Sequence, residues 1–230
     1  MILVPVKNLA NAKQRLAPVL EQSVRTELAQ AMLGEVLEAL SASTADDVSV
    51  VTSDPFATEL ANNYGFEIIA DEGNRSETNA IEMATRVCES RGIETTLVLP
   101  GDIPLVEAAE VRAIYRNAPM TGSVLVPSGD KRGSNAVLRR PAALFPLRFG
   151  SDSFIPHLTA AIATSKPCVV LSFPGIALDI DTPEDLQQLA QAPGEKRSQV
   201  LARKFGSYAP VAPSSPEFRE GGGDLVTTKS

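Results

Sequence analysis

Apolar residues in the first 127 positions alternate between short continuous runs and longer stripes with helical spacing. Residues 2–6 form a continuous apolar run, which is typical of a buried parallel strand. Over residues 21–43 the apolar positions recur at helical intervals and predict an amphipathic helix. The same alternation predicts strands over 48–52, 66–70, 95–99 and 123–127, and helices over 55–64, 79–90 and 107–117. We therefore expect right-handed βαβ units in a three-layer α/β fold, with a mostly parallel sheet and helices on both faces.

The pattern is less regular after residue 127. Residues 135–140 alternate polar and apolar positions, which predicts a half-exposed strand. A helix is expected over 153–164, and further strands over 168–173 and 176–180. Thr182 is a good N-cap residue and Pro183 suits a first helical turn, so another helix is expected to begin there.

The last part of the chain differs in composition from the rest. Residues 209–230 contain three prolines, the run Gly221-Gly222-Gly223 and few apolar residues. Such a segment cannot bury enough apolar surface to fold by itself. We expect one α/β domain over residues 1–208 and a disordered C-terminal tail over 209–230.

Charge and cysteine usage exclude several classes of protein. The formal net charge of −7 argues against general binding to nucleic acid or to a membrane surface. Cys88 and Cys168 are too few for a disulfide framework, and we expect both to be small core residues in a reducing compartment. The apolar start of the chain is too short for a signal peptide, and no stretch approaches the roughly 20 apolar residues of a membrane span. We expect a cytoplasmic protein.

Three cations follow the first predicted strand. Lys7, Lys13 and Arg15 lie within nine residues of one another in an otherwise acidic chain. Ligands of an open parallel sheet bind beyond the carboxyl ends of its strands. Neither a Walker A loop nor a G-x-G-x-x-G motif is present, but two lysines, an arginine and backbone N–H groups can hold a polyphosphate. A solvated basic loop is the alternative interpretation.

Three carboxylates are expected at the same edge of the sheet. Asp102 follows the predicted strand 95–99, and Asp179 and Asp181 lie two positions apart in or beside the predicted strand 176–180, so they share a face. Like charges about 7 Å apart repel each other unless a cation lies near them. Mg²⁺ prefers such oxygen ligands, so we expect one or two Mg²⁺ ions here. The alternatives are a turn aspartate at Asp102 and a helix cap at Asp181.

Small and polar residues also gather in segments 129–135 and 149–154. Glycine and serine let the backbone approach an anion, and a following helix offers free N–H groups. Ordinary turns have the same composition, so the signal is weak by itself. His157 is the only histidine, and we expect a structural role for it.

Five motifs together resemble a known family. The chain resembles the phospho-acid guanylyltransferases of coenzyme F-420 biosynthesis, which are relatives of the molybdenum-cofactor guanylyltransferase. The resemblance runs from residue 2 to about residue 189. It rests on V-P-V-K with A-K-Q-R-L at residues 4–16, P-G-D-I-P-L at 100–105, G-S-N-A at 133–136, F-G-x-x-S-F-x-x-H at 149–157 and D-I-D-T-P at 179–183.

The resemblance implies a nucleotide-diphospho-sugar transferase-like fold and transfer of GMP from GTP to phosphoenolpyruvate or 2-phospho-L-lactate, with release of pyrophosphate. It implies that Lys7, Lys13 and Arg15 act on the triphosphate, and that Asp102, Asp179 and Asp181 hold Mg²⁺. The substrate-binding residues it implies are Asn79, Ser134, Asn135, Gly150 and Ser153. Where the family has G-L-N, this chain has Glu77-Thr78-Asn79, which leaves the strictness of guanine preference open.

Other functions stay open at this point. A nucleotidylyltransferase of the same fold with a sugar-phosphate or molybdopterin acceptor is one alternative, and a non-catalytic nucleotide-binding protein is another. The sequence leaves the phospho-acid open, and it leaves open whether the protein is a monomer or a homodimer.

Overall fold

The computed structural model describes residues 1–73, 76–150 and 152–205, so the tail expected over 209–230 lies outside the described residues. Within these residues one sheet of seven strands has the order β3-β2-β1-β4-β6-β5-β7. Six strands run parallel, and β6 is antiparallel to its neighbours β4 and β5. The strands are β1 (Ile2–Val6), β2 (Val48–Thr52), β3 (Glu67–Ala70), β4 (Thr96–Val98), β5 (Gly122–Pro127), β6 (Ser134–Arg140) and β7 (Cys168–Val170). The expected mostly parallel sheet is confirmed.

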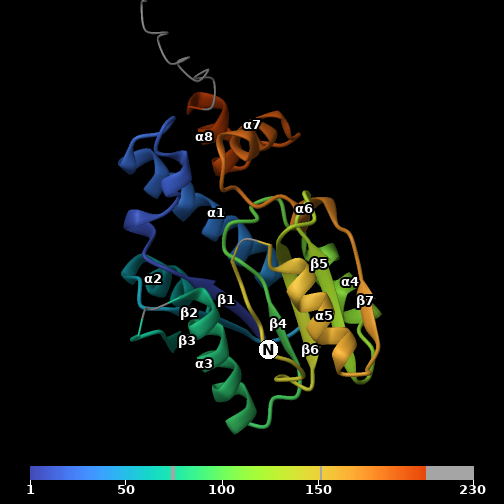
Figure 1. Cartoon of the computed structure of the whole chain (residues 1–230). Helices are drawn as coiled ribbons and strands as arrows, with labels where there is room; N and C mark the ends of the chain where they lie inside the picture. Colours follow the sequence, from blue (N-terminus) through green and yellow to red (C-terminus); the bar gives the residue numbers. More distant parts are fainter. Residues whose placement is uncertain (74–75, 151, 206–230) are drawn as a thin grey trace, which may run out of the picture.

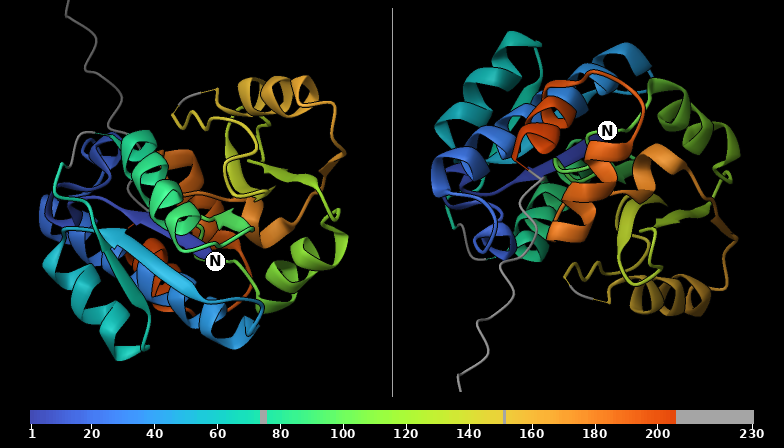
Figure 2. Two further views of the ribbon diagram at one scale, coloured as in Figure 1. Left: turned by 90° about the horizontal axis from the view of Figure 1, so that it is seen from below. Right: turned by 90° about the horizontal axis from the view of Figure 1, so that it is seen from above.

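Helices cover both faces of the sheet (Figure 1). On one face lie α1 (Gln22–Ser43), α2 (Pro55–Asn63) and α4 (Ala108–Asn117), and on the other lie α3 (Glu77–Ser90) and α5 (Phe154–Ala163) (Figure 2, left). In β1 the side chains of Val4 and Val6 pack on the first face and Leu3 packs on the second. Because the strand is buried on both sides, it is apolar at every position, as the sequence pattern predicts.

A third apolar cluster lies beyond the carboxyl ends of the strands. It joins the start of α1 to α7 (Pro183–Gln191) and α8 (Arg197–Phe205), which stand above the sheet in Figure 1. Ile180, Leu186 and Leu201 are among its buried members. Helix α8 was not expected from the sequence pattern. The buried Ile180 thus anchors the segment before α7 in this cluster.

Two predictions about the second half of the chain are wrong. The expected strand 176–180 is absent: Pro174–Ala177 forms the short helix α6, and the chain then runs without a strand partner to Thr182. Side chains hold this segment instead, since Asn135 Nδ2 donates to Ile176 O over 2.9 Å and Gly175 N–H donates to Glu110 Oε1 over 2.8 Å. The expected half-exposed strand, β6, is buried because both of its faces are covered: Ala136 and Leu138 pack in the core on one face of the sheet and Val137 in the core on the other.

Strand direction decides which residues meet at the carboxyl edge of the sheet. Strands β1, β4 and β5 are parallel and end at the same edge, where Lys7, Asp102 and Ser128 follow them. Because β6 runs the opposite way, its first residues, Ser134 and Asn135, lie at that edge too. None of the helices in the described ranges is both long and apolar enough to cross a bilayer.

Candidate active site

A cavity of about 1400 Å³ opens at the carboxyl edge of the sheet. Its walls come from the loops after β1, β4 and β5, from the start of β6, from the loop before α5, and from the segment that leads into α7. Ten of the eleven predicted site residues line it: Lys7, Lys13, Arg15, Asp102, Ser134, Asn135, Gly150, Ser153, Asp179 and Asp181. The fold thus gathers residues that lie up to 174 positions apart into one cavity.

The loop after β1 is folded tightly, and the backbone of Lys13 in it has a left-handed conformation. Two short 3₁₀ helices, Leu9–Asn11 and Gln14–Leu16, flank Lys13, whose φ is 56°. Leu9 and Leu16 are buried and anchor the loop at both ends. The amide of Leu9 also donates to Asp54 Oδ2 over 2.9 Å. Because its anchors fix the loop, the Lys13 ammonium has a defined position in the cavity.

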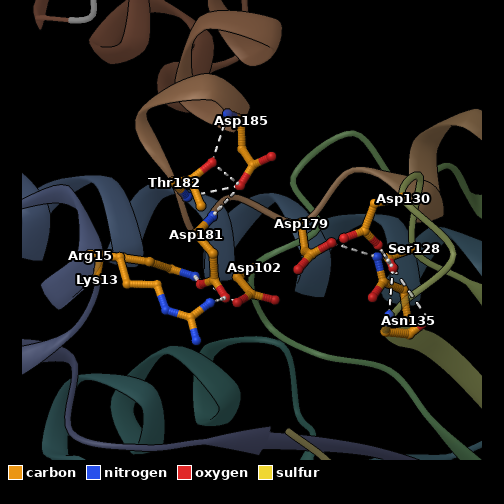
Figure 3. Close-up of polar contacts among 11 residues, drawn as sticks. Lys13, Arg15, Asp102, Ser128, Asp130, Asn135, Asp179, Asp181, Thr182 and Asp185 are labelled. Carbon is orange, nitrogen blue, oxygen red and sulfur yellow. Dashed lines mark hydrogen bonds and ion pairs between the residues drawn. The ribbon is translucent and has the colours of Figure 1, made fainter. Parts of the chain in front are cut away.

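Lys13 joins two of the predicted metal ligands (Figure 3). Its Nζ lies 2.6 Å from Asp102 Oδ2 and 3.0 Å from Asp181 Oδ1, and Arg15 Nη1 lies 3.5 Å from Asp181 Oδ2. Burial by itself would lower the pKa of Lys13, but the charges and hydrogen bonds of the two aspartates outweigh it and raise the pKa. For Asp181 burial by itself would have the opposite effect and raise the pKa, but the charges of Lys13 and then Arg15 hold this pKa below its ordinary value.

Two further contacts fix the aspartate segment. The amide of Ile180 donates to Asp102 O over 3.1 Å, so the two aspartate-bearing segments are tied through the backbone. Thr182 caps α7, as predicted, and Asp185 Oδ2 accepts from the amides of Asp181 and Thr182 over 3.1 and 2.8 Å. Asp181 is therefore held at the entrance to α7 while its own carboxylate remains available to cations.

Asp179 faces a different partner. Its Oδ1 accepts a hydrogen bond of 2.9 Å from Asn135 Nδ2 (Figure 3). Burial raises the pKa of Asp179, the Asn135 hydrogen bond lowers it, and the charges of Asp102 and Asp181 raise it further, so the net shift is upward. In the part of the chain that the structure describes, Asp179 has no ion pair of the kind that Lys13 and Arg15 give Asp181.

The donor chemistry of these residues fits a hard divalent cation. Asp102, Asp179 and Asp181 offer carboxylate oxygens in one cavity, which are the ligands that Mg²⁺ prefers. Over the ranges that the structure describes, however, no group of three acidic, histidine or cysteine side chains is already gathered in a metal-holding arrangement. The Lys13 ammonium lies between Asp102 and Asp181, so a positive charge already compensates two of the three carboxylates.

Ser134 and Ser153 come together on the other side of the cavity. The amide of Ser134 donates to Ser153 Oγ over 3.0 Å, and both residues are buried. The Ser153 side chain makes no capping hydrogen bond to α5, so it is not a simple helix cap. Gly150 lines the same cavity with a φ of +127°, a conformation that side chains rarely allow, and this explains the glycine.

The structure places Asn79 away from the cavity. It is exposed on the first turn of α3, where its amide donates to Ser76 Oγ over 3.1 Å. Among the described residues, Glu77 is the member of this turn that lines the cavity. Burial, followed by the charge of Asp102, raises the pKa of Glu77 to about 7. The sequence carried one signal for Glu77, because this residue stands where the family motif G-L-N has glycine.

A salt bridge that the sequence analysis missed links two of the cavity loops. Arg132 Nε and Nη2 lie 2.5 and 3.1 Å from the two carboxylate oxygens of Asp152, and both residues line the cavity. The loop that carries Arg132 follows β5, and a cation beyond a strand was the signal that identified Lys7. His157, for which the sequence predicts a structural role, is buried. Of the two cysteines, Cys88 is buried and Cys168 is half-buried.

The fold is that of the nucleotide-diphospho-sugar transferases. A solved structure from Desulfovibrio desulfuricans, described as a candidate nucleotide-diphospho-sugar transferase, superposes with a TM-score of 0.71 at 19% identity over 88% of this chain and 93% of its own. At this identity the similarity concerns the fold alone. It confirms the expected nucleotide-diphospho-sugar transferase-like architecture.

Sequence comparison identifies the family. The family described as "Guanylyl transferase CofC like" matches residues 1–219, and this chain belongs to it. The phosphoenolpyruvate guanylyltransferase of Roseiflexus castenholzii is 37% identical over 88% of this chain and 93% of its own. The 2-phospho-L-lactate guanylyltransferase of Methanothermobacter thermautotrophicus is 34% identical over 81% and 82%. The protein is thus a guanylyltransferase, and the non-catalytic alternative is set aside.

Proposed function

We propose that the protein transfers GMP from GTP to phosphoenolpyruvate in the biosynthesis of coenzyme F-420, with release of pyrophosphate. One observation carries this proposal: several relatives, which are up to 37% identical over most of the chain, are named phosphoenolpyruvate guanylyltransferases. The cavity supports it, since cations and carboxylates meet there as a phosphate-transfer site requires. Two free thiols suit the reducing cytoplasm, where we place the reaction.

Two further acceptors are each supported by a specific relative. The enzyme named for 2-phospho-L-lactate is 34% identical, and another, named for 3-phospho-D-glycerate, is 32% identical. All three acceptors are three-carbon acids that carry one phosphate and one carboxylate. The same subsite chemistry therefore serves each of them.

Cations of the loop after β1 would bind the triphosphate. Lys7, Lys13 and Arg15 line the cavity beside the carboxylates, and Arg15 is largely exposed. Positive groups there neutralise the charge that develops on the leaving pyrophosphate. Lys13 already has carboxylate partners, so we expect it to exchange part of these contacts for phosphate oxygens.

Mg²⁺ is the cofactor that we propose for the carboxylates. Asp102, Asp179 and Asp181 would hold it, because they combine oxygen donors with a surplus of negative charge. When bound, Mg²⁺ would supply charge neutralisation and orientation of phosphate oxygens.

The reaction needs no general base. A phosphate oxygen of the acceptor is already anionic, and it would form a bond to the α-phosphorus of GTP as the bond from that phosphorus to the bridging oxygen of the β-phosphate breaks. The electron pair leaves with pyrophosphate. Catalysis then consists of positioning and charge stabilisation. Ser134, Gly150 and Ser153 would hold the acceptor through hydroxyl and backbone donors.

Pyrophosphate release over a matrix of substrates tests this function. The four nucleoside triphosphates are combined with phosphoenolpyruvate, 2-phospho-L-lactate, 3-phospho-D-glycerate and a sugar phosphate, and products are identified by mass. We expect turnover with GTP and phosphoenolpyruvate that Lys13→Met abolishes. The exposed Lys166 provides a matched control, Lys166→Met. Turnover only with the sugar phosphate, or with no phospho-acid, would contradict the proposal.

A further inference from the structure

His157 is buried in α5, and both of its ring nitrogens are hydrogen-bonded. Nε2 lies 2.9 Å from the amide nitrogen of Arg148, and Nδ1 lies 2.9 Å from Ser134 Oγ. The ring also meets Phe149 edge-on, with ring centroids 5.0 Å apart. The imidazole therefore contacts two of the segments that form the acceptor side of the cavity.

These contacts determine where the imidazole carries its proton. The amide of Arg148 can only donate, so Nε2 must be the unprotonated, accepting nitrogen. Burial and then the charge of Arg139 lower the pKa of His157 to about 4, so the ring is neutral at neutral pH. A neutral imidazole has one N–H, which is consequently on Nδ1 and donates to Ser134 Oγ.

This donation determines what the Ser134 hydroxyl can do. Its oxygen accepts from His157, so its own hydrogen must point to another acceptor. The structure offers it no second partner among the described residues, and Ser134 lines the cavity. Ser153 is in the same state, since its Oγ accepts from the Ser134 amide and it also lines the cavity. Two hydroxyl hydrogens are thus left to donate toward the cavity.

We propose that His157 is a positioning residue, which makes the Ser134 hydroxyl a donor to an anionic oxygen of the acceptor. The imidazole does not touch the substrate; it acts through Ser134 by filling the accepting side of that hydroxyl. An anion needs donors, and a serine hydroxyl turned to accept would repel it. This inference rests on the proposed function, because it places the phospho-acid against Ser134 and Ser153.

A purely structural histidine predicts different behaviour. It would support α5 and the loop at Arg148 and Phe149, and its loss would lower stability and affect both substrates alike. A positioning residue changes the KM of the phospho-acid and leaves that of GTP nearly unchanged.

Three substitutions separate the two roles. In His157→Asn the side-chain amide reaches about as far as Nδ1 and can still donate to Ser134. In His157→Gln the amide reaches toward Arg148 and loses the Ser134 contact, and His157→Phe loses both contacts. Thr164 Oγ1 bonds Ala161 O at the far end of α5, so Thr164→Val is a matched control for weakening the helix.

We expect His157→Gln and His157→Phe to raise the KM of the phospho-acid by about 10-fold or more, as loss of a hydrogen bond to a charged group does. His157→Asn should recover most of this loss, and Thr164→Val should change neither KM. Wild-type turnover with phosphoenolpyruvate tests the proposed function. The ratios among variants, measured with whichever of the three phospho-acids the wild type uses, test this inference separately.

A double-mutant cycle with Ser134→Ala remains decisive if His157→Phe fails to fold. If His157 acts through Ser134, His157→Gln should add little to the KM effect of Ser134→Ala. Additive effects in the cycle, equal rises in both KM values, or a His157→Asn variant as poor as His157→Gln would each overturn the inference.

Discussion

Lys13 Nζ donates a hydrogen bond to Asp102 Oδ2 over 2.6 Å, although 89 positions separate the two residues in the chain. The contact follows from sheet order, since β1 and β4 are neighbouring parallel strands and both residues lie beyond their carboxyl ends. It joins the cationic loop to the carboxylates. The groups proposed for the triphosphate and for the metal are therefore one connected network.

Lys13 and a divalent cation should compete for the same carboxylates. Lys13→Met removes the charge between Asp102 and Asp181, so we expect the Kd of the free enzyme for Mn²⁺, used as a probe for Mg²⁺, to fall at least ~3-fold. Titration calorimetry measures this directly, with Lys166→Met as the control. An unchanged or weaker Mn²⁺ affinity would show that these carboxylates do not hold the metal.

Loss of either paired aspartate should stop catalysis without unfolding the protein. We expect Asp102→Asn or Asp181→Asn to lower kcat at least ~100-fold, as removal of a key electrostatic contact does. Circular dichroism should show an intact fold, and the exposed Asp47 provides a control substitution, Asp47→Asn. Near-normal turnover in both folded variants would contradict the role assigned to them.

Ser153→Val should lower the stability of the protein and weaken its binding of the phospho-acid. The substitution removes the acceptor of the buried Ser134 amide, at a cost of about 1–3 kcal/mol in the free energy of unfolding. It should also raise the KM of the phospho-acid roughly 10- to 150-fold while leaving that of GTP nearly unchanged. Ser153→Thr keeps a hydroxyl and should recover much of both losses. Steady-state kinetics and thermal melts measure the two effects, and an equal rise in both KM values would argue for a structural turn only.

His157 should make the protein less stable as pH falls. The unfolded chain takes up a proton near pH 6.5, whereas the folded state resists protonation until about pH 4. Between these values the unfolded state binds more protons, so the free energy of unfolding decreases as pH falls, by up to about 1.4 kcal/mol per pH unit from this residue. Glu77 acts in the opposite sense, because its raised pKa lets the folded state bind the extra proton.

The contribution of His157 is isolated by subtraction. Unfolding by denaturant is measured from pH 4 to 7 for the wild type and for His157→Gln. Since the chain has one histidine, the variant should lose the histidine-dependent slope and keep that of the carboxylates. Equal slopes for the two proteins would mean that His157 takes up its proton as readily in the folded state as in the unfolded state.

The periodicity of apolar residues predicted most of the helices and strands, because a buried face recurs at a fixed interval along the chain. The bounds of β1 and β2 are those that the apolar runs predict, and those of α1 and α4 differ by one residue at their starts. The rule that ligands bind at carboxyl ends then predicted that Lys7 and Asp102 lie at the edge of the sheet, where the structure has them lining the cavity. Position relative to a strand is a local property, so the sequence can supply it.

The same reasoning failed where strand partners are distant. Residues 176–180 have an apolar pattern that suits a strand, but Pro174 starts a helix, and the polar groups that follow bond to Asn135 and Glu110 instead of to a neighbouring strand. Asp179 and Asp181 nevertheless line one cavity. Their proximity comes from the packing of Ile180 and the cap of α7, not from the alternation of a strand.

The sequence by itself determined the layered α/β architecture, the cationic loop and the carboxylate of Asp102 at the sheet edge, because each depends on neighbours along the chain. Only the tertiary structure decided that Lys13 bridges Asp102 and Asp181, that Glu77 lines the cavity while Asn79 does not, and that His157 reaches Ser134. These contacts depend on strand order, on the reversed direction of β6 and on how loops pack. Residues far apart in the chain set those features together, so no local pattern records them.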